Sequence, residues 1–170
     1  MNYLILKTLL LLVALFPADV KWQRITTDQH ISFLFPNNSQ TLKRNTNGIP
    51  STIYQTKDLV CVYGVVCSDF SSQNVDMSGN NLLALYEEMR KSSLSIPTAI
   101  LKAERTVPYD NMLIKEIEYS VINNNFEMTY FKRFIFRDKY VYQISIGGRT
   151  RHLQTIKEDG EVFFNSVNFN

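Results

Sequence analysis

The side chains that most often carry out chemistry are scarce in this sequence, which has two cysteines, Cys61 and Cys67, and two histidines, His30 and His152. Two thiols are too few for a disulfide scaffold or a four-thiolate zinc site. A histidine that acts as a general base needs a positioned partner, and neither histidine belongs to a motif that supplies one. The sequence also lacks the Gly-x-Ser-x-Gly and His-Glu-x-x-His patterns of hydrolases. We therefore expect no catalytic residues and a protein that is not an enzyme.

The acidic residues do not indicate a metal site. Asp69, Asp76 and Asp110 fall in expected loops. None of them lies in the aspartate-rich loop, closed by a glutamate, that binds calcium. We expect neither a metal nor a cofactor.

The spacing of Cys61 and Cys67 argues against a disulfide between them. Six positions apart on one straight strand, their Cα atoms would lie about 20 Å apart, whereas a disulfide needs less than about 7 Å. The even spacing puts both side chains on one face of the sheet, where buried thiols pack as small apolar groups. Two alternatives remain: a disulfide, if Tyr63 and Gly64 form a turn, and a catalytic cysteine pair.

Basic residues in three segments form the candidate interaction patch: Lys132, Arg133, Arg137, Lys139, Arg149, Arg151 and His152. If these segments meet at one edge of the fold, they would present a positive surface to an acidic protein or to anionic lipid headgroups. The alternative is an ordinary solvated surface. A net charge of +2 gives no reason to expect a nucleic acid partner.

The N-terminal residues 1–18 have the pattern of an export signal. Lys7 precedes an apolar run that extends to Phe16 and is closed by Pro17. The run is shorter than the roughly 20 residues that cross a bilayer. We expect cleavage after Ala18, no transmembrane span in the mature chain, and a periplasmic or extracellular location. An uncleaved N-terminal membrane anchor is the alternative.

Residues 19–170 are predicted to form a single domain, since 45% hydrophobic residues can fill one core of this size. An alternation of apolar and polar residues predicts most of its strands. The expected strands are 31–35, 51–55, 59–69, 112–121, 126–136 and 140–146. Asn123 to Asn125 should form a hairpin turn, Gly147 and Gly148 should end the last strand, and the polar segment 37–48 should be rich in turns.

Within the strand 112–121, Glu116, Glu118 and Ser120 are expected on a polar face. Apolar residues on both faces of the strand 126–136 predict a sheet covered by helices on both sides, with the aromatic residues in the core. The three- and four-residue spacing of apolar residues predicts a helix over 81–93, capped by Ser78 or Asn80. A second helix is expected over 157–167.

The order of these features resembles the PsbP-like superfamily, which includes Mog-type Ran-binding proteins and exported bacterial proteins of unassigned role. The resemblance rests on these segments: Ile31–Pro36, the strands of Tyr54 and Tyr63, the hairpin 116–136, Tyr140–Ile144 and Phe163–Phe169. Val167 stands where the closing motif commonly has phenylalanine. The resemblance implies an α+β fold in which helices flank a central antiparallel β-sheet as an α/β/α sandwich, closed by a helix and a short strand.

The resemblance implies little about function, because its members range from photosystem accessory subunits to a regulator of a small GTPase. We expect an exported, non-enzymatic accessory or protein-interaction domain of the cell envelope, with an envelope protein as partner. The alternative is a carrier that holds a lipid or another apolar ligand between sheet and helix.

Overall fold

The computed structural model describes residues 22–109 and 112–169, so the expected export signal lies outside the described residues. The strands are β1 (Gln23–Thr26), β2 (Ile31–Phe35), β3 (Gln40–Thr46), β4 (Ile49–Lys57), β5 (Cys61–Asp69), β6 (Ile100–Tyr109), β7 (Met112–Asn123), β8 (Phe126–Arg137), β9 (Tyr140–Arg149) and β10 (Asn168–Phe169). The helices are α2 (Gly79–Ser93), the 3₁₀ helix η1 (Thr150–His152) and α3 (Leu153–Asn165).

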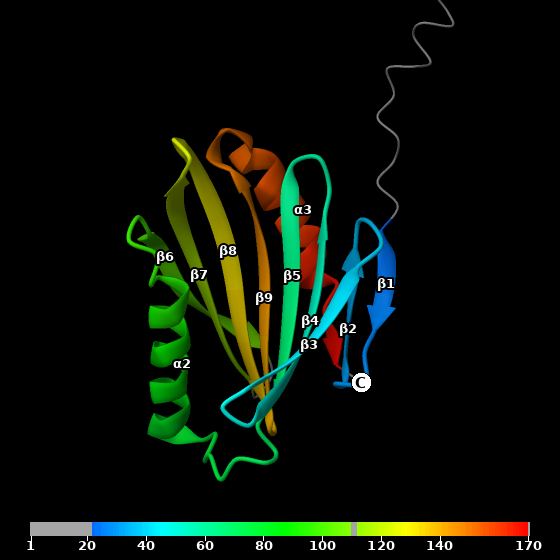
Figure 1. Cartoon of the computed structure of the whole chain (residues 1–170), viewed down its shortest axis with the longest axis vertical. Coiled ribbons are helices and arrows are strands. Elements are labelled where there is room, and N and C mark those ends of the chain that lie inside the picture. Colours follow the sequence, from blue (N-terminus) through cyan, green and yellow to red (C-terminus); the bar gives the residue numbers. More distant parts are fainter. Residues whose placement is uncertain (1–21, 110–111, 170) are drawn as a thin grey trace, which may run out of the picture.

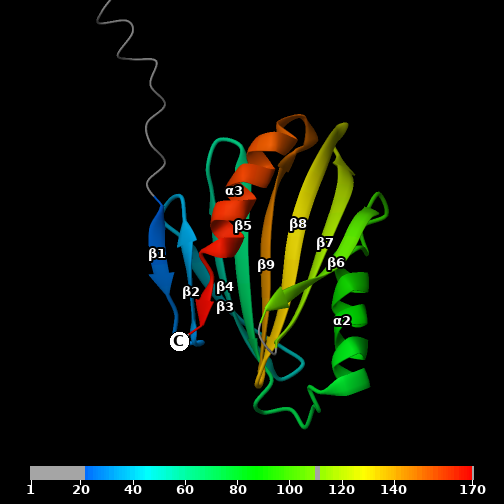
Figure 2. The ribbon, with the colours of Figure 1, turned by 180° about the vertical axis from the view of Figure 1, so that it is seen from behind.

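Seven of the described strands form one antiparallel sheet in the order β3-β4-β5-β9-β8-β7-β6. A small sheet, β1-β2-β10, lies beside it. The two helices lie on opposite faces of the large sheet, with α2 in front in Figure 1 and α3 in front in the reverse view of Figure 2. The expected α+β fold, a central antiparallel sheet flanked by helices, is confirmed, and so is its short closing strand.

The strand β8 contributes to hydrophobic clusters on both faces of the sheet. Phe134 and Phe136 pack under α2 together with Tyr86, whereas Ile135 belongs to the cluster under α3. Because successive side chains of a strand point to opposite faces, such a strand needs cover on both sides. The prediction of a two-sided core is confirmed. Phe126, at the start of β8, is the exception, since it is exposed.

The sequence analysis did not predict three of the strands. The segment 37–48, expected to form turns, contains β3, and no strand was expected at β1 or β6. All residues of β3 are exposed. Its sequence therefore has no burial to impose an alternating pattern, and its strand geometry comes from backbone pairing with β4. A pattern-based prediction detects a strand only when at least one of its faces is buried.

Two element boundaries also differ from expectation. The helix α3 begins at Leu153, earlier than the expected 157, and has no acidic residue in its first turn. The strand β9 continues through both glycines to Arg149. A Cβ atom at Gly147 would overlap the Tyr130 ring and the Thr129 carbonyl oxygen, so glycine at this position permits close packing and does not end the strand.

The two cysteines are buried free thiols on the straight strand β5, as the spacing predicts. The alternative of a disulfide is wrong for this structure, because Tyr63 and Gly64 continue the strand and do not turn. Both thiols belong to the cluster under α3.

Gly160→Ala is expected to stabilise the fold by about 0.5–1 kcal/mol, because glycine in a helix interior costs that much relative to alanine. The added Cβ would lie 3.5 Å from Ile146 Cγ2 and 3.9 Å from Phe164 Cε2, which are ordinary contacts. Urea unfolding of both proteins measures the difference. Gly147→Ala is the opposite control and should destabilise, and a loss of stability in Gly160→Ala would contradict the prediction.

Candidate functional site

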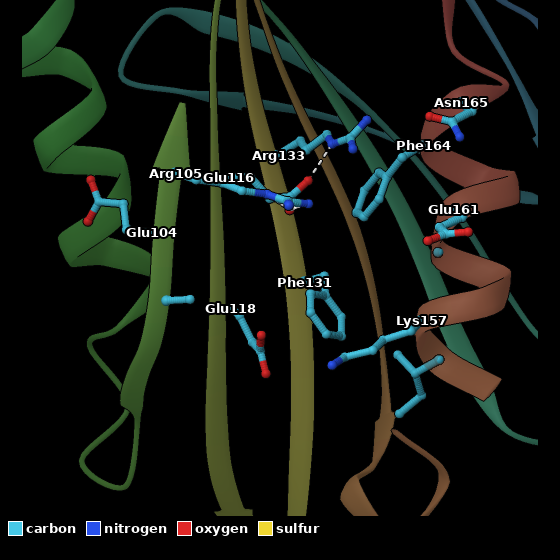
Figure 3. Close-up of a pocket in the computed structure, with 13 residues that line it drawn as sticks. Glu104, Arg105, Glu116, Glu118, Phe131, Arg133, Lys157, Glu161, Phe164 and Asn165 are labelled. Carbon is cyan, nitrogen blue, oxygen red and sulfur yellow. Dashed lines mark hydrogen bonds and ion pairs between the residues drawn. The ribbon is translucent and has the colours of Figure 1, made fainter. Parts of the chain in front are cut away.

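A pocket of about 330 Å³ lies between α3 and the strands β6, β7 and β8 (Figure 3). The helix α3 packs on β9 and β2, and this position leaves the neighbouring part of the same sheet face uncovered. Phe131 and Glu116 form part of the floor, while Lys157, Glu161 and Asn165 come from α3. We call this pocket the α3 groove.

A buried carboxylate lies at the centre of the α3 groove. Strand register places Glu116 of β7 between Arg105 of β6 and Arg133 of β8. Arg105 Nε donates to Glu116 Oε1 at 2.7 Å, and Arg133 Nε donates to Oε2 at 2.5 Å. Glu116 is only 5% exposed. Glu116 thus lies on the expected polar face of its strand, together with Glu118, but it is buried because the two arginines cover its carboxylate.

The two arginines differ in their surroundings. The side chain of Arg105 is 68% exposed, whereas that of Arg133 is 16% exposed and lies over the Phe164 ring, with 4.3 Å between Cζ and the ring centroid. Among the hydrogen bonds of the described residues, Arg133 uses only its Nε. Its two Nη groups are therefore free to donate to a ligand, in the planar fork that carboxylates match.

The other charged side chains that line the α3 groove include both acidic and basic residues. Glu118 from β7 and Lys157 from α3 point toward the space around Phe131, and Glu161 lies farther along α3 (Figure 3). No ion pair within 4.0 Å joins these three side chains to another described residue. A groove lined in this way suits the mixed polar surface of a protein or peptide better than an alkyl chain.

The predicted interaction patch is divided between the two faces of the sheet. Arg133 and Arg137 lie on the α3 side, and Arg137 Cζ is 5.2 Å from the Phe169 ring centroid. Lys132 lies on the α2 side, where its Nζ donates to Ser93 Oγ at 2.9 Å, and burial lowers the pKa of this amine to about 8.

The patch is also divided between the two ends of β9. Lys139 is in the β8–β9 turn, where its Nζ donates to the Val75 carbonyl at 3.2 Å. Arg149, Arg151 and His152 lie at the opposite end of β9 and line a common cleft. The structure thus brings only these three predicted residues together, and it adds Arg133 alone to the α3 groove.

A second polar cluster, which the sequence analysis missed, joins the β4–β5 turn to α3. Asp58 Oδ1 accepts from the backbone N–H groups of Val60 at 2.7 Å and Cys61 at 2.6 Å. Tyr63 Oη lies 2.7 Å from Asp58 Oδ2 and 3.3 Å from Asp159 Oδ2. Burial and the neighbouring Asp58 raise the pKa of Asp159. The wide sequence separation of Asp159 from the turn hides this cluster from pattern analysis.

The chemistry of this cluster does not favour metal binding or catalysis. Asp58, Cys61 and Asp159 have potential ligand atoms within 4.8 Å of one another. However, burial, followed by Asp58 and Asp159, raises the pKa of the Cys61 thiol to about 12. The nucleophile and the metal ligand are the thiolate, which this environment disfavours. His152 lines a cleft together with Asp58, but its Nε2 accepts a hydrogen bond from Arg151 Nε at 3.0 Å.

The chain has a PsbP-like α+β fold, as comparison with solved structures shows. Cyanobacterial PsbP (CyanoP) from Synechocystis sp. PCC 6803 is similar with a TM-score of 0.60 and 13% identity, over 92% of this chain and 99% of CyanoP. LpqN from Mycobacterium tuberculosis, involved in cell envelope biogenesis, is similar with a TM-score of 0.50 and 10% identity, over 91% of this chain and 81% of LpqN. At these identities the likeness shows the fold alone.

No protein-family model and no curated protein sequence matches this chain. Among the described residues, no helix has both the length and the apolar character needed to span a bilayer.

Glu116→Gln is expected to destabilise the fold by about 2–3 kcal/mol, because it leaves the half-buried Arg133 without its counter-charge. Chemical denaturation measures the loss. Glu118→Gln is the matched control, because Glu118 lies on the same face of β7 and has no ion pair within 4.0 Å in the part of the chain that the structure describes. It should change stability by less than about 0.5 kcal/mol. Equal losses in the two variants would show that the arginine pair does not depend on Glu116.

The thiols predict a pH dependence of stability. Burial raises the pKa of Cys61 and of Cys67 to about 12, whereas an unfolded thiol has a pKa of about 8.5. A group that holds its proton more tightly in the folded state adds stability that is complete below the unfolded pKa and is lost as the pH rises toward the folded value.

We therefore expect the free energy of unfolding to fall between pH values of about 9 and 11, and to fall less steeply in the Cys61→Ala/Cys67→Ala double variant. Urea unfolding at a series of pH values measures both slopes. Identical slopes would assign the loss of stability to other groups, such as Tyr63, because burial also raises the pKa of its hydroxyl.

Proposed function

We propose that this protein is an exported, non-enzymatic accessory domain of the cell envelope, and that it binds a protein partner in the α3 groove. The observation that carries the proposal is the arrangement around Glu116. Two arginines neutralise this buried carboxylate, and the Nη groups of Arg133 have no hydrogen bond to another described residue and lie beside an aromatic floor. Arginine and aromatic side chains are enriched where protein partners dock.

The chemistry of the other clusters supports a binding role over an enzymatic one. His30 stacks edge-on against Tyr140 at the start of β9, whereas His152 follows the end of that strand. Burial raises the pKa values of both thiols, Cys61 and Cys67, whereas an activated cysteine nucleophile has a lowered pKa. The involvement of LpqN, which shares the fold, in cell envelope biogenesis is compatible with an envelope location.

A carrier of an apolar ligand is the second candidate, and a separate groove beside α2 favours it. This groove has a volume of about 730 Å³ and is lined by the apolar side chains of Ile49, Phe70, Val75, Leu85 and Met89, among others. It lies on the sheet face opposite the α3 groove. The two candidate functions therefore use different surfaces and can be tested separately.

Site-specific photocrosslinking tests the partner proposal in the cells that make the protein. A photoreactive amino acid replaces Glu161, an exposed residue of the α3 groove, and in the control it replaces Lys91, an exposed residue of α2. We expect one reproducible protein adduct from position 161 and none of that mass from position 91. Lys157→Glu should reduce the adduct about tenfold by like-charge repulsion or lost attraction, and Lys91→Glu should not.

Two results would contradict the partner proposal. One is the absence of any reproducible adduct at position 161, and the other is the same adduct at both positions. Mass spectrometry of organic extracts from the same preparations tests the carrier. A retained lipid without a protein adduct would replace the first candidate function by the second.

A further inference from the structure

One end of the molecule combines exposed apolar side chains with basic side chains. It is formed by the β4–β5 turn, the β7–β8 turn and η1, which lie together at the top of Figure 1. Leu59, at the tip of the β4–β5 turn, is fully exposed, and Val62, Ile122 and Phe126 are about half exposed. We call this surface the turn end. Exposed apolar side chains that gather at one end of a protein mark an interaction surface.

The basic residues of the turn end surround these apolar tips. Lys57, Arg149 and Arg151 line one cleft together with Leu59 and Val62. Arg149 Cζ lies 4.0 Å from the Phe126 ring centroid, so the two kinds of side chain are in direct contact. Neither Lys57, Arg149 nor Arg151 has an ion pair within 4.0 Å among the described residues.

The acidic side chains Asp58, Asp159 and Glu127 at this end each have a partner within the fold. Asp58 turns its carboxylate inward to the backbone of Val60 and Cys61 and to the Tyr63 hydroxyl. Glu127 lies 3.7 Å from Lys102 as an ion pair. The basic side chains of Lys57, Arg149 and Arg151, which have no ion pair among the described residues, complement an anionic surface.

The chain also enters the fold at this end. The strand β1, the first described strand, begins at Gln23, which pairs with Phe35 of β2, and it runs away from the turn end (Figures 1 and 2). The sequence of residues 1–18 contains the apolar run that directs a chain to a membrane.

We propose that the turn end binds the surface of an anionic lipid bilayer. Leu59, Val62 and Phe126 would enter the boundary between headgroups and acyl chains, and Lys57, Arg149 and Arg151 would contact the lipid phosphates. This inference goes beyond the proposed partner function, because it uses a different surface and no protein partner. A molecule held by this end exposes the α3 groove at its side, where a partner can reach it.

Vesicle binding tests the proposal with residues 19–170, which contain all described strands, helices and core clusters. The probes are vesicles of phosphatidylcholine and phosphatidylglycerol in equal parts, and vesicles of phosphatidylcholine alone. We expect binding to the anionic vesicles that is at least tenfold tighter and that weakens with added salt. A folded protein that binds neither, or both equally, overturns the proposal.

Variants locate the binding surface. Leu59→Ser should weaken binding about tenfold, whereas Leu83→Ser, at an exposed leucine of α2, should not change it. The double variant Lys57→Gln/Arg151→Gln should weaken binding about fivefold for each charge removed. The control is the double variant Lys43→Gln/Arg44→Gln on the exposed strand β3, which should weaken binding clearly less. Equal effects of each pair would overturn the assignment to the turn end. All six substituted positions are exposed, so we expect each variant to fold.

The single tryptophan reports the orientation independently of any variant. Trp22 precedes β1 and packs against Tyr63 of β5, a few residues from the β4–β5 turn, with 5.8 Å between ring centroids. Brominated phosphatidylcholine in the anionic vesicles should quench its fluorescence, because bromine quenches only at short range. Binding without quenching would place the opposite end on the membrane and overturn the proposal.

Discussion

The burial of β8 and β9 on both faces is the constraint from which the rest of the structure follows. Their side chains alternate between two hydrophobic clusters, with Phe134, Phe136 and Val141 on the α2 side and Ile135, Tyr142, Ile144 and Ile146 on the α3 side. A sheet that is apolar on both faces must be covered on both. Each face has only one helix in the described part of the chain, and one helix is narrower than seven strands. Uncovered sheet beside each helix is the geometric result.

The grooves beside the two helices differ in chemistry because different elements line them. Beside α3, β6 and β7 bring Arg105 and Glu116 to the surface of the sheet, and the register with β8 adds Arg133. Beside α2, the lining is mostly apolar. A carboxylate as buried as Glu116 is tolerated because two charge-assisted hydrogen bonds replace its hydration. The polar groove is thus a property of strand pairing, and each arginine is held in place by the buried group beneath it.

The turns between the strands form the ends of the molecule. The β4–β5 turn is held by Asp58, whose carboxylate binds the backbone of the turn and the Tyr63 hydroxyl. This bond network is internal, and it leaves Leu59 at the tip without any cover. Asn124 and Asn125 adopt positive φ values of 48° and 66° in the β7–β8 turn, which asparagine tolerates better than most residues. The rigid turns therefore present Leu59 and Phe126 at defined positions.

The sequence alone determined the elements that bury a face: the strands around Phe33, Tyr63, Ile117, Phe134 and Ile144, the helix around Tyr86, and the asparagine turn. Periodicity reveals these because burial selects apolar residues at every second or at every third and fourth position. It also determined that Cys61 and Cys67 cannot meet, since strand geometry separates them. It could not reveal β3, whose residues are all exposed, or the start of α3, whose first turn has no capping signal.

Only the tertiary structure decided where charged residues meet. Glu116, Arg105 and Arg133 are neighbours through strand register, and Lys57 and Arg149 through the folding of two separate hairpins. Seven basic positions that are close in sequence were divided between two faces and two ends, because alternation along β8 sends Lys132 and Arg133 to opposite sides. Contacts between distant segments depend on register and helix placement, which no local pattern encodes. The candidate site therefore came from the fold, whereas the residues that build the fold were already evident in the sequence.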